Sequence, residues 1–249
     1  MSVSGRFSGT LKNCRHFFQS SEPGLIMEIY KENFVQFMLR SNVLTFGDFT
    51  TKSGRRTPFF INTGRYRTGE QMNQLAGFYA DAVQARQLQF DFLFGPAYKG
   101  IPLVVALAME LSRRGHDVPF CFNRKEAKDH GEGGVLVGHQ PKPGERVLIV
   151  EDVTTAGTSI RETVPILKAA APVVIVGLVV SVNRMERGLG QLNALTELRQ
   201  EFNMDAFAIA NITEIAEYLR GREIDGKVCV TEELYGRIDA YRKQYGGTE

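Results

Sequence analysis

Two adjacent acids, Glu151 and Asp152, end an apolar run and lead into a loop of small and hydroxyl-bearing residues. That loop consists of Val153, Thr154, Thr155, Ala156, Gly157, Thr158 and Ser159. Exposed backbone N–H groups in such a loop, at the start of a helix, form a site for an anion and suit a phosphate best. Carboxylates would repel the phosphate itself, but they accept hydrogen bonds from sugar hydroxyls or hold Mg²⁺. The stretch therefore predicts a site for a ribose 5-phosphate, with an ordinary βα loop and exposed acids as the alternative.

A second loop, Phe94–Pro102, also lies between an expected strand and an expected helix. Lys99 stands near the start of that helix, where an acid or a small polar cap would stabilise the helix better. A cation at this point indicates an anionic ligand, and Gly95 and Gly100 would let the backbone approach it. The alternative is a surface lysine in a tight turn.

The third unusual segment, 123–134, is rich in charge and in glycine. Its cations are Arg124, Lys125, Lys128 and His130, and its glycines are Gly131, Gly133 and Gly134. A segment whose one apolar side chain is Ala127 fits a mobile flap that closes over a polyanion. Taken alone, such a charge run is more often a solvated loop. Because two other loops suit anions, we interpret it as a flap.

The elements that must position these loops alternate between strands and helices. Apolar spacing predicts helices at Met27–Arg40, Thr68–Arg86, Ile101–Arg114, Gly157–Ala170, Glu186–Phe202, Ile212–Leu219 and Glu232–Tyr245. It predicts strands at Leu44–Thr51, Pro58–Asn62, Phe90–Phe94, Val118–Asn123, Arg146–Glu151, Val173–Val182 and Ala206–Ile209. The alternation indicates an α/β fold with a doubly wound, mainly parallel sheet flanked by helices, and ligands bind such sheets at the carboxyl ends of the strands. The first two strands form a hairpin that we expect to be a small cap.

The composition is typical of a globular protein: of 249 residues, 43% are hydrophobic and 23% are charged. A formal net charge of +2 gives no reason to expect nucleic acid or an anionic membrane as a partner. No apolar run approaches the roughly 20 residues that span a bilayer. Three cysteines lie far apart without a CxxC motif, and we interpret Cys121 and Cys229 as packing thiols.

Residues 1–26 form an extension in which Arg6, Lys12 and Arg15 face a single acid, Glu22. Its Ser-rich composition faintly resembles a transit peptide, but it lacks the apolar core of a secretory signal. We interpret it as a disordered tail, or as the result of a start site assigned too early, with Met27 as the true first residue. Residues 27–249 are then a single domain, with the cap at about 27–65.

The segment Glu151–Ser159 resembles the ribose-phosphate signature of type I phosphoribosyltransferases, in which two acids after an apolar strand precede a Thr- and Gly-containing loop. Four further segments narrow the resemblance to the orotate phosphoribosyltransferases of the short bacterial and fungal kind. They are KSGRRTPFFINTG (52–64), FGPAYKGIP (94–102), FNRKEAKDHGEGG (122–134) and the Asn183-Arg184 step. The similarity runs from about Met27 to the C-terminal helix, and the first 26 residues match nothing in the family pattern.

The resemblance implies a reaction in which orotate and 5-phosphoribosyl 1-diphosphate give orotidine 5′-phosphate and pyrophosphate, on the way to UMP in pyrimidine biosynthesis. It implies Mg²⁺, bridging pyrophosphate and ribose oxygens largely through water and without direct protein ligands. It also implies a cytoplasmic homodimer in which the flap, Arg124–Gly134, of one subunit covers the site of the other.

The family's residue roles carry over to the matching positions of this chain. Those implied to bind phosphoribosyl diphosphate are Tyr98, Lys99, Arg124, Lys125, Lys128, His130, Glu151, Asp152, Val153, Thr154, Thr155, Ala156, Gly157, Thr158 and Ser159. Those implied to bind orotate are Lys52, Phe60, Ile61, Thr155 and Arg184, of which the arginine suits a carboxylate. Those implied to be catalytic are Lys52, Lys128, His130 and Asp152.

Two alternatives stay open. One is a phosphoribosyltransferase for a purine or for uracil, against which Arg184 and the segment 52–64 argue, because those bases carry no carboxylate. The other is a regulator that kept the fold and lost catalysis. A regulator should lose flap residues or gain a nucleic-acid surface, whereas this flap is intact and the chain from Met27 onward is formally neutral.

Overall fold

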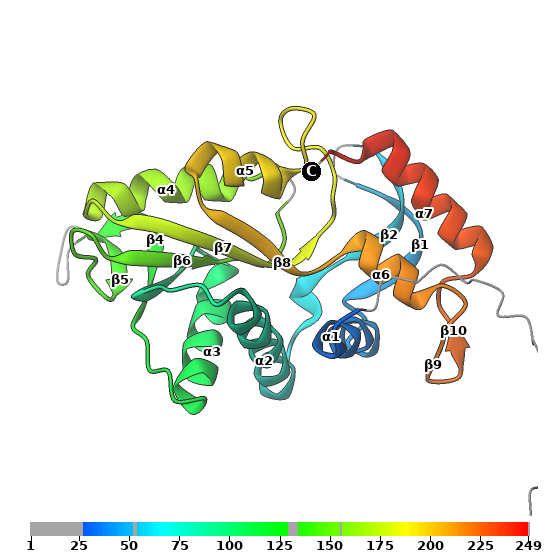
Figure 1. Ribbon diagram of the computed structural model, residues 1–249, viewed down its shortest axis with the longest axis horizontal. Helices are drawn as coiled ribbons and strands as arrows, with labels where there is room; N and C mark the ends of the chain where they lie inside the picture. The colour runs from blue at the N-terminus through cyan, green and yellow to red at the C-terminus, as the bar shows by residue number, and fades with distance from the viewer. Residues whose placement is uncertain (1–26, 52–53, 129–133, 155, 249) are drawn as a thin grey trace, which may run out of the picture.

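The computed structural model describes residues 27–51, 54–128, 134–154 and 156–248. A six-stranded sheet forms its centre (Figure 1). The strands of this sheet are β3 Phe92–Gly95, β4 Phe120–Lys128, β5 Gly134–Gly138, β6 Arg146–Val150, β7 Val174–Asn183 and β8 Asp205–Asn211. Their order is β5-β4-β3-β6-β7-β8, with β5 antiparallel to β4 and the other pairs parallel. The predicted mainly parallel sheet is confirmed.

Helices cover both faces of the sheet. They are α1 Ile29–Arg40, α2 Gly69–Arg86, α3 Gly100–Arg113, α4 Thr158–Ala170, α5 Ala194–Phe202, α6 Ile212–Leu219 and α7 Glu232–Tyr245. Figure 1 shows α2 and α3 on one face and α4 and α5 on the other, so that two apolar cores form, one on each side. A strand that is covered on both faces needs apolar side chains in both directions. This explains why β6 contains an unbroken apolar run, Val147 through Val150, all of it fully buried.

Capping boxes fix where helices α2 and α6 begin. The hydroxyl of Thr68 accepts a hydrogen bond from the backbone N–H of Gln71 (3.2 Å), and the Gln71 side chain accepts one from the backbone N–H of Thr68 (3.3 Å). The capping box predicted for α2 is thus confirmed. Asn211 and Glu214 form an equivalent box at the start of α6.

A separate hairpin caps the carboxyl ends of the sheet strands. It consists of β1 (Leu44–Thr50) and β2 (Arg56–Ile61), which pair antiparallel as predicted. The hairpin packs against α7, where the ring of Phe59 meets the ring of Tyr241 edge to face, with 5.7 Å between centroids. The C-terminal helix therefore supports the cap from behind. A second, short hairpin, β9 (Glu223–Ile224) and β10 (Lys227–Val228), was not predicted.

The predicted helix at Glu186–Phe202 is wrong in its first half, because α5 begins only at Ala194. Asn193 caps this helix by accepting a hydrogen bond from the backbone N–H of Thr196 (3.2 Å). Residues 186–193 form a loop that isolated bridges tie to the C-terminus. The Glu197 carboxylate also accepts a hydrogen bond from the backbone N–H of Leu189 (2.8 Å). The sequence pattern of residues 186–193 thus predicts a helix, but tertiary contacts stabilise a loop there instead.

The third unusual segment, predicted as a loop from Asn123 onward, is partly strand. Strand β4 continues through Lys128, and β5 begins at Gly134 and pairs with it. The two strands pair at Asn123 and at Lys128, with an irregular register between these positions, so that β5 anchors both ends of the strand portion of the segment. Residues 129–133 lie outside the described part of the chain.

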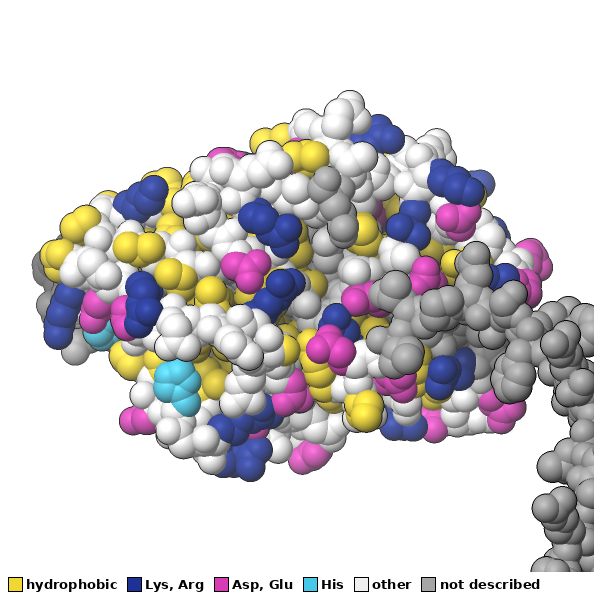
Figure 2. Space-filling model, in the orientation of Figure 1, with side chains coloured by type: hydrophobic (Ala, Val, Ile, Leu, Met, Phe, Trp, Pro, Cys, Tyr) yellow, Lys and Arg dark blue, Asp and Glu magenta, His cyan; other side chains and the backbone are white. Residues whose placement is uncertain are grey.

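Charges of both signs share the surface. On the face shown in Figure 2, basic and acidic side chains are interspersed, without the continuous basic area that nucleic-acid binding uses. Among the helices of the described residues, none combines the length and the apolar character needed to cross a membrane.

Candidate active site

A cavity of about 540 Å³ opens where β6 and β7 end beneath the cap. Its lining includes Phe60, Ile61, Lys99, Asp152, Val153, Ala156 and Arg184. These residues come from the hairpin, from the loops after β3 and β6, and from the end of β7, so that the fold brings together segments far apart in sequence. These residues were predicted for ligand binding, but others in the lining were not, among them Thr63 and Glu186.

Asp152 forms the polar centre of this cavity. Its carboxylate accepts hydrogen bonds from the ammonium group of Lys99 (2.7 Å) and from the hydroxyl of Thr63 (2.7 Å). Lys99 also approaches the Thr63 hydroxyl at 3.3 Å. Burial alone would raise the pKa of Asp152, but its hydrogen bonds, with those from Lys99 and Thr63 the strongest, outweigh burial and lower it. Asp152 is therefore ionised and paired with Lys99 at neutral pH.

Glu151, the other acid, behaves in the opposite way. Burial, reinforced by the neighbouring charge of Asp152, raises the pKa of Glu151 to about 8. Its carboxyl oxygen accepts a hydrogen bond from the backbone N–H of Asp152 (2.8 Å). At neutral pH the Glu151–Asp152 pair thus carries one proton and one negative charge.

The backbone of the two acids is held by residues that the sequence did not reveal. Tyr79, on α2, donates a hydrogen bond to the backbone carbonyl of Glu151 (2.6 Å). Ser181, on β7, donates one to the carbonyl of Asp152 (2.6 Å). Tyr79, Ser181 and Thr63 all act through tertiary contacts. Only Thr63 had a sequence signal, since it lies inside the segment 52–64 that resembles the family.

The loop after β6 depends on Gly157. Its φ of +73° lies in the left-handed region, and a Cβ atom there would stand 2.9 Å from Leu198. The Gly157 N–H donates to the Thr154 hydroxyl (3.0 Å), and Arg161 donates to the carbonyl of Ala156. The loop is thereby folded into a compact turn at the N-terminus of α4, the geometry expected of a phosphate cradle.

The glycines of the loop after β3 allow backbone segments to pack closely against one another. A Cβ on Gly95 would lie 2.3 Å from the carbonyl oxygen of Gly100, and one on Gly100 would lie 3.0 Å from that of Val150. Asn123 reinforces the loop by accepting a hydrogen bond from the backbone N–H of Ala97 (2.8 Å). The peptide bond between Ala97 and Tyr98 is cis, and Tyr98 is largely exposed.

A neighbouring cavity of about 360 Å³ gathers the described flap cations, Arg124 and Lys125. Ala97, from the loop after β3, and Ser159, at the start of α4, also line it. The two anion-suited loops, after β3 and after β6, therefore contribute to both cavities. Of the other predicted site residues, Lys128 is described only as part of β4, and Thr158 is exposed at the start of α4. Lys52, His130 and Thr155 lie outside the described residues.

Arg184 lies at the end of β7 with its guanidinium 4.6 Å above the ring of Phe59. Its Nε and Nη2 both donate to one carboxylate oxygen of Glu186, at 3.0 and 2.5 Å. The hydroxyl of Tyr241, on α7, donates to the same oxygen at 2.8 Å. Sequence reasoning identified Arg184 but missed Glu186 and Tyr241, since nothing local links α7 to this strand end.

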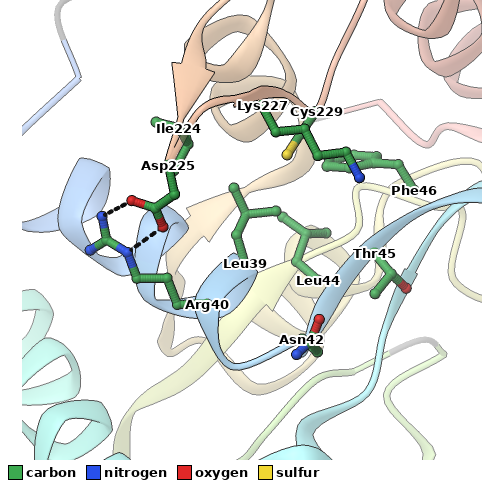
Figure 3. Close-up of a pocket in the computed structure, with 10 residues that line it drawn as sticks. All are labelled: Leu39, Arg40, Asn42, Leu44, Thr45, Phe46, Ile224, Asp225, Lys227 and Cys229. Carbon is green, nitrogen blue, oxygen red and sulfur yellow. Dashed lines mark hydrogen bonds and ion pairs between the residues drawn. The ribbon is translucent and has the colours of Figure 1, made fainter.

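Another cavity, of about 370 Å³, lies between the end of α1, the start of β1 and the β9–β10 hairpin (Figure 3). Arg40 and Asp225 form a two-pronged ion pair across it, at 2.8 and 2.9 Å. The half-buried thiol of Cys229 also lines this cavity. The other described cysteine, Cys121, lies in the sheet, where burial raises the pKa of its thiol to about 12 and keeps it protonated. No described residue of the three anion-suited loops lines this cavity, so it is separate from the candidate active site.

Within its described residues, the site offers a magnesium ion no dedicated protein cage. Among the described residues, no group of three or more His, Cys, Asp or Glu side chains is arranged to hold a metal. Mg²⁺ commonly keeps several waters and binds one or two carboxylates together with substrate phosphates. With Glu151 protonated and Asp152 paired with Lys99, the site suits a magnesium ion held mainly by substrate oxygens and water, as the family resemblance implies.

Comparisons with known proteins agree with this geometry. A family model for a phosphoribosyl transferase domain matches residues 65–209. Orotate phosphoribosyltransferases of Clostridium beijerinckii and Clostridium acetobutylicum are each 55% identical to the chain over 222 residues, which covers 88% of this chain and 99% of each relative. The crystal structure of orotate phosphoribosyltransferase from Francisella tularensis is 37% identical, with a TM-score of 0.76, and the match covers 86% of this chain and all of that one. The chain therefore belongs to the phosphoribosyltransferase family and, within it, to the orotate phosphoribosyltransferases.

Proposed function

We propose that the chain transfers the 5-phosphoribosyl group of 5-phosphoribosyl 1-diphosphate to orotate, with Mg²⁺, through the residues of the 540 Å³ cavity and the flap. The observation that carries this proposal is the presence of Arg184 and the Asp152–Lys99 pair in one cavity. A guanidinium suits the carboxylate of orotate, and the acid suits the ribose. Relatives that are 55% identical over most of the chain and are named orotate phosphoribosyltransferase support it.

The chemistry requires charge stabilisation more than a nucleophile. Breaking the C1–O bond puts positive charge on the ribose ring and negative charge on the departing pyrophosphate. Ionised Asp152 accepts hydrogen bonds from the ribose hydroxyls and stabilises the cationic ring. Glu151, protonated at neutral pH, can both donate and accept there. The loop Thr154–Ser159 binds the 5′-phosphate, with Gly157 setting its turn.

Cations on the other side of the ring neutralise the pyrophosphate. Arg124 and Lys125 line the 360 Å³ cavity, and Lys99 reaches the ribose side from the loop after β3. By resemblance to the family, Lys52, Lys128 and His130 act at the reacting centre. When bound, Mg²⁺ adds further positive charge to the leaving group.

The base occupies the side of the cavity nearest the cap. Phe60 and Ile61 line that side and offer an apolar surface for a planar ring. Arg184 contributes the charged edge, which a purine or uracil would leave unpaired because neither carries a carboxylate. We further infer a homodimer in which the flap of one subunit completes the site of its partner. Action in the cytoplasm stays a prediction.

The test is consumption of orotate, followed by ultraviolet absorbance in the presence of phosphoribosyl diphosphate and Mg²⁺, with uracil and hypoxanthine as parallel bases. We expect loss of orotate only in the complete mixture. The Asp152→Asn variant should lower kcat about 100-fold or more, because a neutral amide stabilises the cationic ring poorly. Asp225→Asn, which breaks the exposed ion pair with Arg40, should leave kcat unchanged. Binding of phosphoribosyl diphosphate without turnover of any base would instead support the regulator.

A further inference from the structure

The carboxylate of Glu186 joins three elements behind the base side of the cavity. One of its oxygens accepts hydrogen bonds from Arg184, at the end of β7, and from Tyr241, on α7. Its other oxygen lies 3.8 Å from a terminal nitrogen of Arg55, in the cap. Glu186 and Arg184 are only 5% and 9% exposed. Acidic side chains are seldom buried unless they are paired, so the burial of Glu186 beside a cavity indicates a specific structural role.

The hydrogen bonds use one edge of the Arg184 guanidinium and leave the other edge free. A guanidinium has five N–H donors in a fixed planar fork. Nε and one hydrogen of Nη2 are taken by Glu186. Within the part of the chain that the structure describes, Nη1 has no hydrogen-bond partner, and Arg184 lines the cavity. The free edge therefore has the geometry that a carboxylate binds with two parallel hydrogen bonds.

We propose that Glu186 is a positioning residue for the base: held by Tyr241 and the C-terminal segment, it fixes the plane of Arg184 so that the free edge of the guanidinium meets the carboxylate of orotate. The inference rests on the proposed function and deepens it. Phe59 also supports Arg184, since its fully buried ring packs against the guanidinium and against the ring of Tyr241. The hydrogen bonds to Glu186 thus fix the orientation of the Arg184 guanidinium plane, and the ring of Phe59 fixes its position against the cap.

The C-terminal segment holds the loop that carries Glu186. The Arg187 side chain donates to the carbonyls of Gly246 (3.0 Å) and Gln244 (2.9 Å). The backbone N–H of Gly247 donates to the carbonyl of Met185 (2.9 Å), and that of Asn193 donates to the carbonyl of Thr248 (2.9 Å). The last residues of the chain therefore run beside the loop that begins at the base site, and specificity depends on a segment remote in sequence.

The hydroxyl of Tyr241 acts as a donor throughout the working pH range. Burial and the Glu186 charge raise the pKa of Tyr241, so that it stays protonated. Removing the hydroxyl takes away one of the hydrogen bonds on Glu186 while the ring remains against Phe59. Tyr241→Phe is therefore a milder variant that tests the same mechanism if Glu186→Gln folds poorly.

The experiment measures kcat and the KM of each substrate for wild type, Glu186→Gln and Tyr241→Phe, with thermal unfolding recorded for each. We expect the KM for orotate to rise about tenfold in Glu186→Gln and about threefold in Tyr241→Phe, because a misaligned guanidinium loses one charge-assisted hydrogen bond to the carboxylate. The KM for phosphoribosyl diphosphate should stay within about twofold of wild type, since neither Glu186 nor Tyr241 forms a hydrogen bond to the described residues of the loops that bind it. The double variant should be less than additive, because both changes act on one carboxylate.

Glu110→Gln is the matched control. Glu110 is equally buried, at 5% exposed, and its carboxylate accepts hydrogen bonds from Arg113 (2.7 Å) and Arg114 (2.6 Å) far from the base side. It should lower thermal stability without a selective change in the KM for orotate. If Glu186→Gln and Tyr241→Phe lower stability but leave the KM for orotate unchanged, or raise both KM values equally, the positioning role is refuted. If wild type itself does not consume orotate, the proposed function fails first, and the inference falls with it.

Discussion

At the scale of the residue, the two neighbouring acids have different protonation states because their partners differ. Asp152 has a cation and a hydroxyl within 2.7 Å, whereas burial is the dominant influence on Glu151. A charged carboxyl without a countercharge is costly to bury, so the one proton that the pair keeps stays on Glu151. Adjacent carboxyls of this kind suit a site in which one group must carry charge and the other must hold a proton.

Glu151 makes stability depend on pH. Its folded pKa of about 8 exceeds the ordinary value of 4.5, so the folded chain keeps a proton that the unfolded chain releases in this window. The contribution to stability is fully present below pH 4.5 and is lost as the pH rises through 8. Glu151→Gln cannot titrate, and we expect its free energy of unfolding at pH 8 to exceed that of wild type by about 1–3 kcal/mol.

Urea unfolding at several pH values between 5 and 8 measures this difference. Glu217→Gln, at an exposed position on α6, is the control and should follow the wild-type curve. A wild-type slope that persists in Glu151→Gln would show that another group causes the pH dependence. Because the carboxylate pair is expected to bind ribose, the variant should also lose activity even where it gains stability.

At the scale of the element, the loop between β6 and α4 shows how one glycine shapes a binding site. Its φ of +73° is strained for an L residue, and a methyl group there would press on Leu198 in α5. We expect Gly157→Ala to lower the free energy of unfolding by about 1–2 kcal/mol. It should also raise the KM for phosphoribosyl diphosphate about threefold to tenfold, because the phosphate cradle shifts.

Gly115→Ala separates the two effects. Gly115 closes α3 with a φ of +87°, and no atom lies within 4 Å of the position that a Cβ would occupy there. This variant should lose stability with no change in the KM for phosphoribosyl diphosphate. Denaturant unfolding measures the stability of both variants, and steady-state kinetics measures their KM for phosphoribosyl diphosphate. If Gly157→Ala and wild type have equal KM values, the turn at Gly157 does not contribute to phosphate binding.

At the scale of the whole molecule, the cap and the loops that follow β3, β6 and β7 line the larger cavity, and Arg124 and Lys125 line the neighbouring one. If two subunits share their sites, a flap variant and a site variant should complement each other. We expect a mixture of Lys128→Ala and Asp152→Asn to recover about a quarter of the wild-type activity once subunits exchange, because half of the dimers then contain one intact site.

Native mass spectrometry would verify the exchange, and orotate consumption would measure the recovery. A chain that carries both substitutions, mixed with Asp152→Asn, should recover nothing, since every site then lacks Asp152. An exchanged mixture of the two single variants that stays inactive would mean that each subunit supplies its own flap.

Local patterns in the sequence determined most of the fold. The unbroken apolar runs specified buried parallel strands, and the capping box at Thr68 specified the start of α2. The acids after β6, Lys99 after β3 and Arg184 after β7 each stand where a strand ends, and the carboxyl ends of parallel strands meet at one edge. That is why a site could be predicted from segments far apart in the chain.

Only the tertiary structure decided which groups hold those residues in place. The hydrogen bonds of Tyr79, Ser181 and Tyr241 cross from other elements, at sequence separations that no local pattern encodes. The same holds for the loop before α5, whose sequence pattern predicts a helix. In the folded chain Asn193 accepts a hydrogen bond from the backbone N–H of Thr196 and caps α5, and the C-terminal residues pair with the loop. Local sequence fixes backbone preference and polarity, whereas the protonation of Glu151 and the orientation of Arg184 arise from burial and from partners that only the folded chain supplies.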